Sequence, residues 1–293
     1  MTDRMPPVFR FAPSPNGLLH LGHAYSALLN FQMAQKSSGT FLLRIEDIDT
    51  ERCRPELEAQ MLHDLEWLGI EWDAEPRRQS DHFDDYADAL AKLEAKGIIY
   101  PAFMSRSEIR RAIEPWGISW QTDPDGVPLY PGEERDLPLE QTARMVTERE
   151  RHTKRLHMGK ACAAPLLPLS WQENGAGPDG ETGVITARPE AWGDVVIARS
   201  DTPTSYHLAV VVDDALQGVT TVVRGQDLFH STSVHRLLQT LLELPEPAYH
   251  HHRLITDENG NKLSKSRGDI SLKAMREAGK SPDDIKRMIG FHE

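Results

Sequence analysis

His20 and His23 follow a loop rich in proline and glycine, and they stand three residues apart at the start of a predicted helix. This spacing places both imidazoles on one helix face, where each can donate to a phosphate oxygen. A helix start also presents unpaired N–H groups and the positive end of a dipole, which favour anions. Gly22 has no Cβ, so a flat purine ring can lie against the backbone. The stretch suits a nucleoside triphosphate, although a single HxxH motif also occurs in packing or as a metal pair.

Lys262 and Lys265 belong to the stretch KLSKS, which follows an Asn-Gly turn. Ammonium groups on a loop can meet negative charge as it develops on a phosphoryl group, and they then stabilise the transition state selectively. Taken alone, KLSKS is only a lysine-rich loop. Together with PSPNGLLHLGH (13–23), it predicts a reaction at the phosphates of ATP.

Strands and helices alternate in the first third of the chain. Residues 7–12 and 40–47 have the pattern of strands, and residues 54–70 and 81–97 have the pattern and the end signals of helices. This alternation predicts an α/β fold with a Rossmann-type parallel sheet covered by helices on both faces. Further strands are expected at 194–199, 206–214 and 219–225, and a further helix at 232–244.

The stretch between these two groups of elements has a different composition. Residues 98–192 are rich in proline, glycine and charge, and they show little regular periodicity, which indicates an insertion into the sheet domain. The predicted organisation is a first half of the catalytic domain at 1–97, an inserted subdomain at 98–192, a second half at 193–245, and a segment with the KLSKS loop and a helical tail at 246–293.

The composition restricts the class of protein. Hydrophobic residues make up 39% of the 293 residues, and the two cysteines, Cys53 and Cys162, are far apart, which excludes a disulfide framework. We find neither a signal-peptide pattern nor an apolar run that approaches the ~20 residues needed to span a bilayer. The net charge of -12 argues against nonspecific nucleic-acid binding but leaves room for a local basic surface. We expect a soluble, cytoplasmic protein that does not bind membranes.

The two motifs resemble the signatures of a known family. HLGH (20–23) is similar to the HIGH signature, and KLSKS to the KMSKS signature, of class I aminoacyl-tRNA synthetases. RFAPSPNGLLHLGH with RIEDID (44–49) narrows the resemblance to the glutamyl/glutaminyl subgroup. The chain resembles, nearly end to end, the shortened glutamyl-queuosine tRNA(Asp) synthetases, which lack an anticodon-binding domain. Because the sequence ends soon after KLSKS, we expect no such domain here.

This resemblance implies a fold, a reaction and partners. It implies the HIGH-type nucleotidyl transferase fold with an acceptor-type inserted subdomain, and a ligase that forms glutamyl-adenylate from L-glutamate and ATP with Mg²⁺. The glutamyl group would then pass to queuosine at the wobble position of tRNA(Asp). His20, His23, Lys262 and Lys265 would be catalytic, and His20, Gly22, His23 and Lys265 would bind ATP. The resemblance also suggests a monomer and activation without tRNA.

Three other functions stay open from the sequence. A truncated glutamyl-tRNA synthetase would share the adenylation site and charge a tRNA 3′ end instead. A small-molecule nucleotidyltransferase also uses an HxGH fold. A non-catalytic RNA-binding paralogue would be expected to have lost the histidines or the lysines of the motifs, whereas this chain keeps them.

The resemblance also implies the glutamate site. Arg10 and Ser14 would hold carboxylate oxygens, Ala12 would contribute backbone, and Glu46 would receive the ammonium group. The residues that would close the pocket are Tyr206 and Arg224. Arginine forks and one carboxylate suit a substrate with two carboxylates and one ammonium. Glu46 with Asp47 and Asp49 can also be read as an acidic turn, and Tyr206 as core, but Arg224 ends a strand where open α/β sheets bind ligands.

Several features bear on metals. The family commonly holds zinc in the insertion, but Ala102, Met104 and Glu134 occupy the cysteine positions here, so we expect no zinc and an insertion held by packing. Its expected core is Phe103, Trp116, Trp120 and Tyr130. The histidines at 250–252 alternate between strand faces, which favours contact with a nucleotide or solvent over a metal site. Asp213 and Asp214 suit either Mg²⁺ ligands or turn formers. We therefore assign no metal-binding residue.

Overall fold

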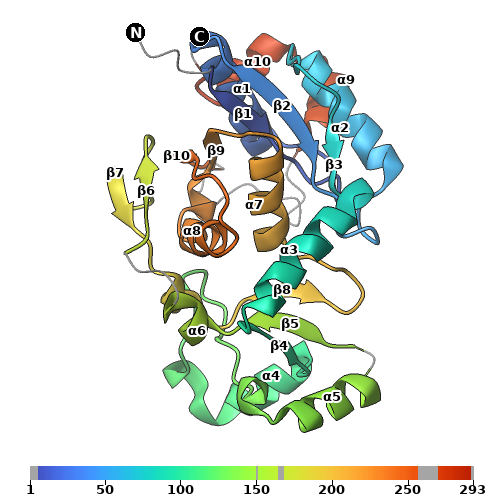
Figure 1. Cartoon of the computed structure of the whole chain (residues 1–293). Helices are drawn as coiled ribbons and strands as arrows, with labels where there is room; N and C mark the ends of the chain where they lie inside the picture. The colour runs from blue at the N-terminus through green and yellow to red at the C-terminus, as the bar shows by residue number, and fades with distance from the viewer. Residues whose placement is uncertain (1–5, 150, 164–167, 257–269, 292–293) are drawn as a thin grey trace.

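The protein has a central parallel sheet, as the alternation of its elements predicts. Its structure, a computed structural model, describes residues 6–149, 151–163, 168–256 and 270–291 (Figure 1). Strands β1 (Val8–Phe11), β2 (Thr40–Ile45) and β3 (Arg77–Arg78) pair in parallel in the order β1-β2-β3. Because parallel neighbours need crossover connections, helix α1 (Leu21–Lys36) links the first pair.

A second group of strands continues beside β1. The order β7-β6-β10-β9 joins β6 (Ser170–Glu173), β7 (Gly183–Thr186), β9 (Thr221–Gly225) and β10 (Ala248–His252). The pairs β9–β10 and β6–β10 are parallel, and β6–β7 is antiparallel. The Thr220 N–H donates to the Val8 carbonyl at 3.0 Å, so β9 begins next to β1. The α/β class and the parallel sheet are therefore confirmed.

Helices cover the sheet and enclose two main apolar cores. The first core lies between β1, β2, α1 and α2 (Pro55–Trp67), and α9 (Leu272–Glu277) and α10 (Pro282–Met288) pack against it (Figure 1). The second lies between α3 (Phe83–Ala95), α7 (Tyr206–Leu216) and α8 (Thr232–Leu241). Within the described ranges, none of the helices has the length and apolar character that a membrane span requires.

The expectation of a strand at 206–214 is wrong, because these residues form helix α7. A short apolar run rich in valine has the pattern of a buried strand, and periodicity alone does not separate it from a buried helix. Tertiary packing decides in favour of the helix. Val210, Val211 and Val212 are all buried in the core that α7 shares with α3 and α8. The helical period also places Tyr206, Asp213 and Asp214 on one face of α7.

The insertion contains its own antiparallel sheet at the far end of the molecule from β1 (Figure 1). Strands β4 (Ile99–Ala102), β5 (Thr153–Leu156) and β8 (Val196–Arg199) form it. Its helices are α4 (Arg106–Ile113), α5 (Leu139–Glu148) and α6 (Met158–Ala163). Two pairings cross the predicted segment limits: β8 joins the sheet of the insertion, and β6 with β7 joins the parallel sheet through β10.

The expected core of the insertion is correct in part. Phe103 is buried, and Trp120 and Tyr130 are half-buried. Trp116, however, is 60% exposed, so its placement in the core is wrong. It lies in a short 3₁₀ segment that follows α4, and its ring contacts that of Trp120 at 6.1 Å between centroids.

Candidate active site

Apart from the KLSKS lysines, the residues that the sequence proposes for nucleotide and glutamate lie at the carboxyl ends of β1, β2 and β9 and at the starts of α1 and α7. Open α/β sheets bind their ligands at this edge. The Tyr206 side chain provides evidence that these groups converge. Burial raises its pKa, and Arg224, Glu46 and Arg10 all act on that pKa electrostatically. The phenol is thus near enough to both predicted arginines and to the predicted carboxylate for their charges to act on it.

His20 and His23 meet at the start of α1. Their ring centroids are 3.9 Å apart, and His20 is the N-cap of the helix. The Nδ1 atom of His20 accepts the Gly22 N–H at 3.1 Å, and Nδ1 of His23 accepts the His20 N–H at 3.2 Å. A neutral imidazole whose Nδ1 accepts carries its proton on Nε2. Both rings are therefore held as donors from the distal nitrogen.

Gly22 has a structural requirement besides the one that the sequence suggests. A Cβ at this position would lie 3.0 Å from Cε1 and 3.1 Å from Nδ1 of the His20 ring. Contacts this short are rare for real Cβ atoms, so a side chain here would displace the ring that caps the helix. The absence of a Cβ thus protects the position of His20.

Arg10 and Arg44 lie side by side at the ends of β1 and β2, and both are buried. Asp214 of α7 pairs with both: its Oδ1 accepts from Arg10 Nε at 3.0 Å and from Arg44 Nη2. Burial would raise the pKa of Asp214, but the two arginines outweigh it and hold the pKa below its ordinary value. Asp213 accepts from Arg77 at 2.8 Å and lies 3.9 Å from Arg44. The two aspartates lie within α7 rather than in a turn, and they are the counter-charges of the arginines.

Glu46 follows β2 and faces this cluster. Its N–H donates to the Pro13 carbonyl at 3.0 Å, which ties the loop after β2 to the loop after β1. Its carboxylate lies 3.6 Å from Arg44 Nε. Burial raises the pKa of Glu46 to about 7, although Arg44 and Arg10 oppose this rise. The carboxylate lacks a strong partner of its own, as a receptor for a substrate ammonium requires.

Arg224 is buried at the end of β9 and is held by neutral groups. It donates from Nε to His251 Nε2 at 3.0 Å and from Nη1 to His235 Nδ1 at 3.1 Å. Its Nη2 donates to Thr232 Oγ1 at 2.6 Å and to the Leu228 carbonyl at 3.1 Å. No carboxylate in the described parts of the chain forms an ion pair with Arg224, in contrast to Arg10 and Arg44.

The structure gives fewer contacts for the remaining predicted site residues. Ala12 and Ser14 lie in the loop after β1, and Ser14 Oγ is 3.6 Å from Cys53 Sγ. Lys262 and Lys265, with the rest of KLSKS, lie outside the described residues.

Sequence reasoning missed several residues around this site. Arg44 is a charged residue within the apolar run TFLLRI, and a charge in such a run indicates a buried ion pair or a site residue. Glu173 and His251 form a buried pair that connects β6 to β10, with Glu173 Oε2 2.6 Å from His251 Nδ1. The expectation that the 250–252 histidines face nucleotide or solvent is therefore wrong for His251, which is 1% exposed.

The insertion positions where the resemblance implies zinc ligands do not fit that metal. A buried methyl stands at Ala102, and the Glu134 carboxylate accepts from the Phe103 N–H at 3.3 Å and from Tyr130 Oη at 2.8 Å. The Met104 N–H donates to Tyr130 Oη at 3.4 Å. These groups offer no thiolate, and the carboxylate already has hydrogen-bond donors. Across the residues that the structure describes, no group of three or more His, Cys, Asp or Glu side chains is arranged to hold a metal.

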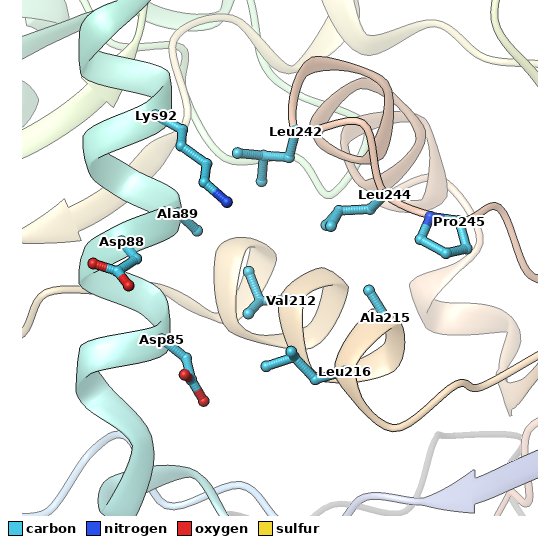
Figure 2. A pocket seen from close by; sticks show the side chains of 10 residues that line it. All are labelled: Asp85, Asp88, Ala89, Lys92, Val212, Ala215, Leu216, Leu242, Leu244 and Pro245. Atoms are coloured by element: carbon cyan, nitrogen blue, oxygen red, sulfur yellow. The ribbon is translucent and has the colours of Figure 1, made fainter.

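Two hollows lie outside the predicted site. One of about 380 Å³ lies between α3, α7 and the end of α8, and Figure 2 shows Leu216, Leu242 and Leu244 in its wall with Lys92 at its edge. None of the predicted site residues lines it. A smaller hollow of about 130 Å³ is bordered by Pro15 and Asp47, so it adjoins the loops that carry Ser14 and Glu46.

Comparisons with known proteins identify the family of the chain. Residues 8–290 match the family tRNA synthetases class I (E and Q), catalytic domain. The glutamyl-Q tRNA(Asp) synthetase of Rhodobacter capsulatus is 46% identical over 97% of this chain and 100% of its own length. The glutamate–tRNA ligase of Aquifex aeolicus is 37% identical over 94% of this chain and 55% of that protein.

Solved structures give the same result. The crystal structure of glutamate-tRNA synthetase from Elizabethkingia anophelis matches with a TM-score of 0.73 and 27% identity, over 89% of this chain and 53% of that one. Sequence and fold thus agree over most of the chain, and the matched range includes the buried arginines and the histidine pair of α1. The chain belongs to the class I tRNA synthetases of the E and Q type, through their catalytic domain, and is a ligase of glutamyl-tRNA synthetase-like function.

Proposed function

We propose that the protein activates L-glutamate with ATP and transfers the glutamyl group to queuosine at the wobble position of tRNA(Asp). The observation that carries the glutamate assignment is the placement of charge around Tyr206. Arg224 is a buried cation without a carboxylate partner among the described residues, and Glu46 is a half-buried carboxylate, its side chain 14% exposed, whose one ion pair in the described parts of the chain is the 3.6 Å contact with Arg44. A substrate that brings one carboxylate and one ammonium complements both groups.

The two predicted arginines have different parts in this proposal. Arg10 is paired with Asp214, so its positive charge is largely compensated, and it contributes directed N–H groups rather than net charge. Arg224 keeps its charge for the substrate. Ser14, and the backbone at Ala12, border the same edge of the sheet and are proposed to bind carboxylate oxygens.

The first step needs no protein nucleophile. An oxygen of the substrate α-carboxylate attacks the α-phosphorus of ATP in line, a new O–P bond forms, and the bond to the departing pyrophosphate breaks. ATP enters as its magnesium complex, which is a substrate of this reaction. His20 and His23, held as Nε2–H donors, bind the phosphate oxygens, and Gly22 keeps the capping ring in place. Catalysis in such a step rests on positioning and charge stabilisation.

The nucleic-acid acceptor distinguishes the proposal from a second candidate. The relative named glutamyl-Q tRNA(Asp) synthetase is 46% identical and is matched over its full length, which supports queuosine as the acceptor. The relative named glutamate–tRNA ligase is 37% identical, which supports charging of a tRNA 3′ end as the alternative. In both reactions an RNA hydroxyl attacks the glutamyl-adenylate and AMP leaves.

Transfer of labelled glutamate to two tRNA pools tests the proposal. One pool comes from cells that make queuosine and the other from cells that cannot, and each reaction contains ATP and Mg²⁺. We expect label on the queuosine pool alone, and the label should survive removal of the 3′-terminal adenosine. Label on both pools that disappears with this adenosine would establish the alternative. Label on neither pool, with no glutamate-dependent exchange of pyrophosphate into ATP, would contradict both.

A further inference from the structure

We propose that Glu173 and His251 are positioning residues that orient Arg224 toward the substrate carboxylate. This inference rests on the proposed glutamate site and deepens it. Glu173 lies at the end of β6, which belongs to the 98–192 segment, whereas Arg224 and His251 are direct neighbours in the pairing of β9 with β10. The three side chains form one buried chain from carboxylate to imidazole to guanidinium.

The direction of each hydrogen bond follows from the chemistry of the groups. Arginine has only donors, so the 3.0 Å contact with Arg224 Nε requires His251 Nε2 to accept. The imidazole proton therefore resides on Nδ1, and it is donated to Glu173 Oε2 at 2.6 Å. Burial, with the nearby Arg224 charge, lowers the pKa of His251 to about 4, so the ring is neutral at physiological pH.

Further hydrogen bonds, besides the one from His251 Nδ1, hold the Glu173 carboxylate. Its Oε1 accepts the backbone N–H of His251 at 2.8 Å and that of Gly175 at 2.9 Å, and Trp171 Nε1 donates to Oε2 at 3.3 Å. Burial opposes its ionisation, but these hydrogen bonds and His251 outweigh burial and bring its pKa to about 2. The carboxylate is therefore ionised and accepts at both oxygens.

The loop after β6 approaches His251 closely. A Cβ at Gly175 would lie 2.2 Å from the His251 carbonyl oxygen, and the Ala176 N–H donates to the same oxygen at 3.1 Å. Backbone and side chain of His251 are thus both fixed from β6. A carboxylate bonded directly to Arg224 would compensate the positive charge of the guanidinium. The neutral His251 imidazole, which lies between Glu173 and Arg224, fixes the orientation of the guanidinium and leaves its charge uncompensated.

A second arm holds the other side of the guanidinium. His235 Nδ1 accepts from Arg224 Nη1 at 3.1 Å, so its proton is on Nε2, which donates to His207 Nδ1 at 3.2 Å. With Thr232 and the Leu228 carbonyl on Nη2, only one N–H, on Nη1, has no acceptor in the described protein. That N–H is left to meet the substrate, and its direction is set by the acceptors around it.

The alternative is that Glu173 and His251 only fasten β6 to β10. Two variants separate the explanations, because asparagine ends at the δ position of the side chain and glutamine at the ε position. His251→Gln keeps an acceptor for Arg224 and loses the donor to Glu173. His251→Asn keeps the donor to Glu173 and loses the acceptor for Arg224. The measured quantities are the KM values for glutamate and ATP in pyrophosphate exchange, with queuosine-containing tRNA present, and the melting temperature.

We expect His251→Asn to raise KM for glutamate by about tenfold or more while KM for ATP stays within about twofold. His251→Gln keeps the acceptor for Arg224 but loses its anchor on Glu173, so it should raise KM for glutamate by a smaller factor, about threefold. The inference would be overturned if His251→Gln had the higher KM for glutamate and a lowered melting temperature while His251→Asn kept both values of the wild type. That result would show that Glu173 and His251 only fasten β6 to β10. Gln172→Ala, on the exposed side of β6, is the matched control and should change neither KM.

Glu173→Gln gives an independent readout. Two backbone N–H groups hold the oxygen of the new amide, so its NH₂ group faces His251 Nδ1. The ring then takes its proton on Nε2, where it opposes Arg224 Nε–H. Long-range ¹H–¹⁵N NMR of the histidines should show the Nδ1–H form of His251 in the wild type and the Nε2–H form in the variant. An Nε2–H form in the wild type would overturn the inference, and absence of glutamate-dependent exchange in the wild type would instead overturn the proposed function.

Discussion

At the proposed glutamate site, Glu46 and Arg224 are the side chains that would meet the two charges of a zwitterion. Each is a charged group taken out of water with its own charge poorly compensated, which costs free energy in the empty protein. Arg224 always keeps its charge, because a guanidinium does not deprotonate in proteins. Glu46 does not, since burial raises its pKa to about 7. At the scale of the residue, the carboxylate is therefore the group that makes substrate binding depend on pH.

Glutamate activation should weaken as the pH falls through about 7. The substrate ammonium favours ionised Glu46, and protonation below its pKa removes the negative charge that binds it. We expect kcat/KM for glutamate to be roughly tenfold lower at pH 6 than at pH 8. Glu46→Gln should lower kcat/KM and remove this inflection, whereas Glu51→Gln, at an exposed position nearby, should keep it. An unchanged pH profile in Glu46→Gln would assign the inflection to another group.

Helix α7 is the element that assembles the charged part of the site. It places Tyr206 at the proposed glutamate site, and it places Asp213 and Asp214 beside the arginines of β1, β2 and β3, of which Arg10 and Arg44 are buried and Arg77 is half-buried. As a strand, residues 213 and 214 would point to opposite faces, and only one of them would reach Arg44. Helix α7 thus packs against the sheet and also supplies the carboxylates that compensate the arginines of its strands.

Asp214→Asn should destabilise the fold strongly. It leaves Arg10 and Arg44 buried with much less compensation, and breaking a buried pair from one side costs about 3–5 kcal/mol of unfolding free energy. Urea unfolding measures this loss. Asp201→Asn removes the partner of Arg199 at the surface and should cost less than about 1 kcal/mol. Similar small losses in both variants would mean that water reaches the arginines.

The elements that could be predicted from the sequence are those with local signals. Residues 7–12, 40–47 and 219–225 are short apolar runs with turn residues at their ends, and strands form in all three. Residues 206–214 have the same local pattern but form a helix, because their neighbours in space decide. In the site, Arg10, Glu46 and Arg224 could be named from the family resemblance. Glu173 could not, since only the pairing of β6 with β10 brings it to His251, 78 residues along the chain.

At the scale of the whole molecule, the insertion both leaves the parallel sheet and returns to it. Strands β4 and β5 build a separate antiparallel sheet, which β8 completes, while β6 and β7 extend the catalytic sheet at the β10 side. The insertion thus contributes β6, which pairs with the strand that carries His251, as well as a distant subdomain. Because Glu173 lies on β6, the stability of the insertion affects the position of this carboxylate.

The distal part of the insertion should hold its shape without zinc. The Glu134 carboxylate joins the segment after β4 to Tyr130 through hydrogen bonds from the Phe103 N–H and the tyrosine hydroxyl. We expect elemental analysis to find well below one zinc per chain, and a chelator to leave the melting temperature unchanged. Stoichiometric zinc would refute this.

Glu134→Ala should then show what replaces the metal. The Phe103 N–H and the Tyr130 hydroxyl lose their acceptor, which costs about 1–3 kcal/mol of unfolding free energy in a partly buried place. Glu133→Ala is the matched control, because Glu133 is exposed and makes no capping hydrogen bond. If both variants unfold at the same urea concentration as the wild type, packing around Phe103 alone holds this part of the insertion. If only Glu134→Ala is destabilised, the Glu134 carboxylate joins the two segments where the resemblance implies cysteine thiolates and zinc.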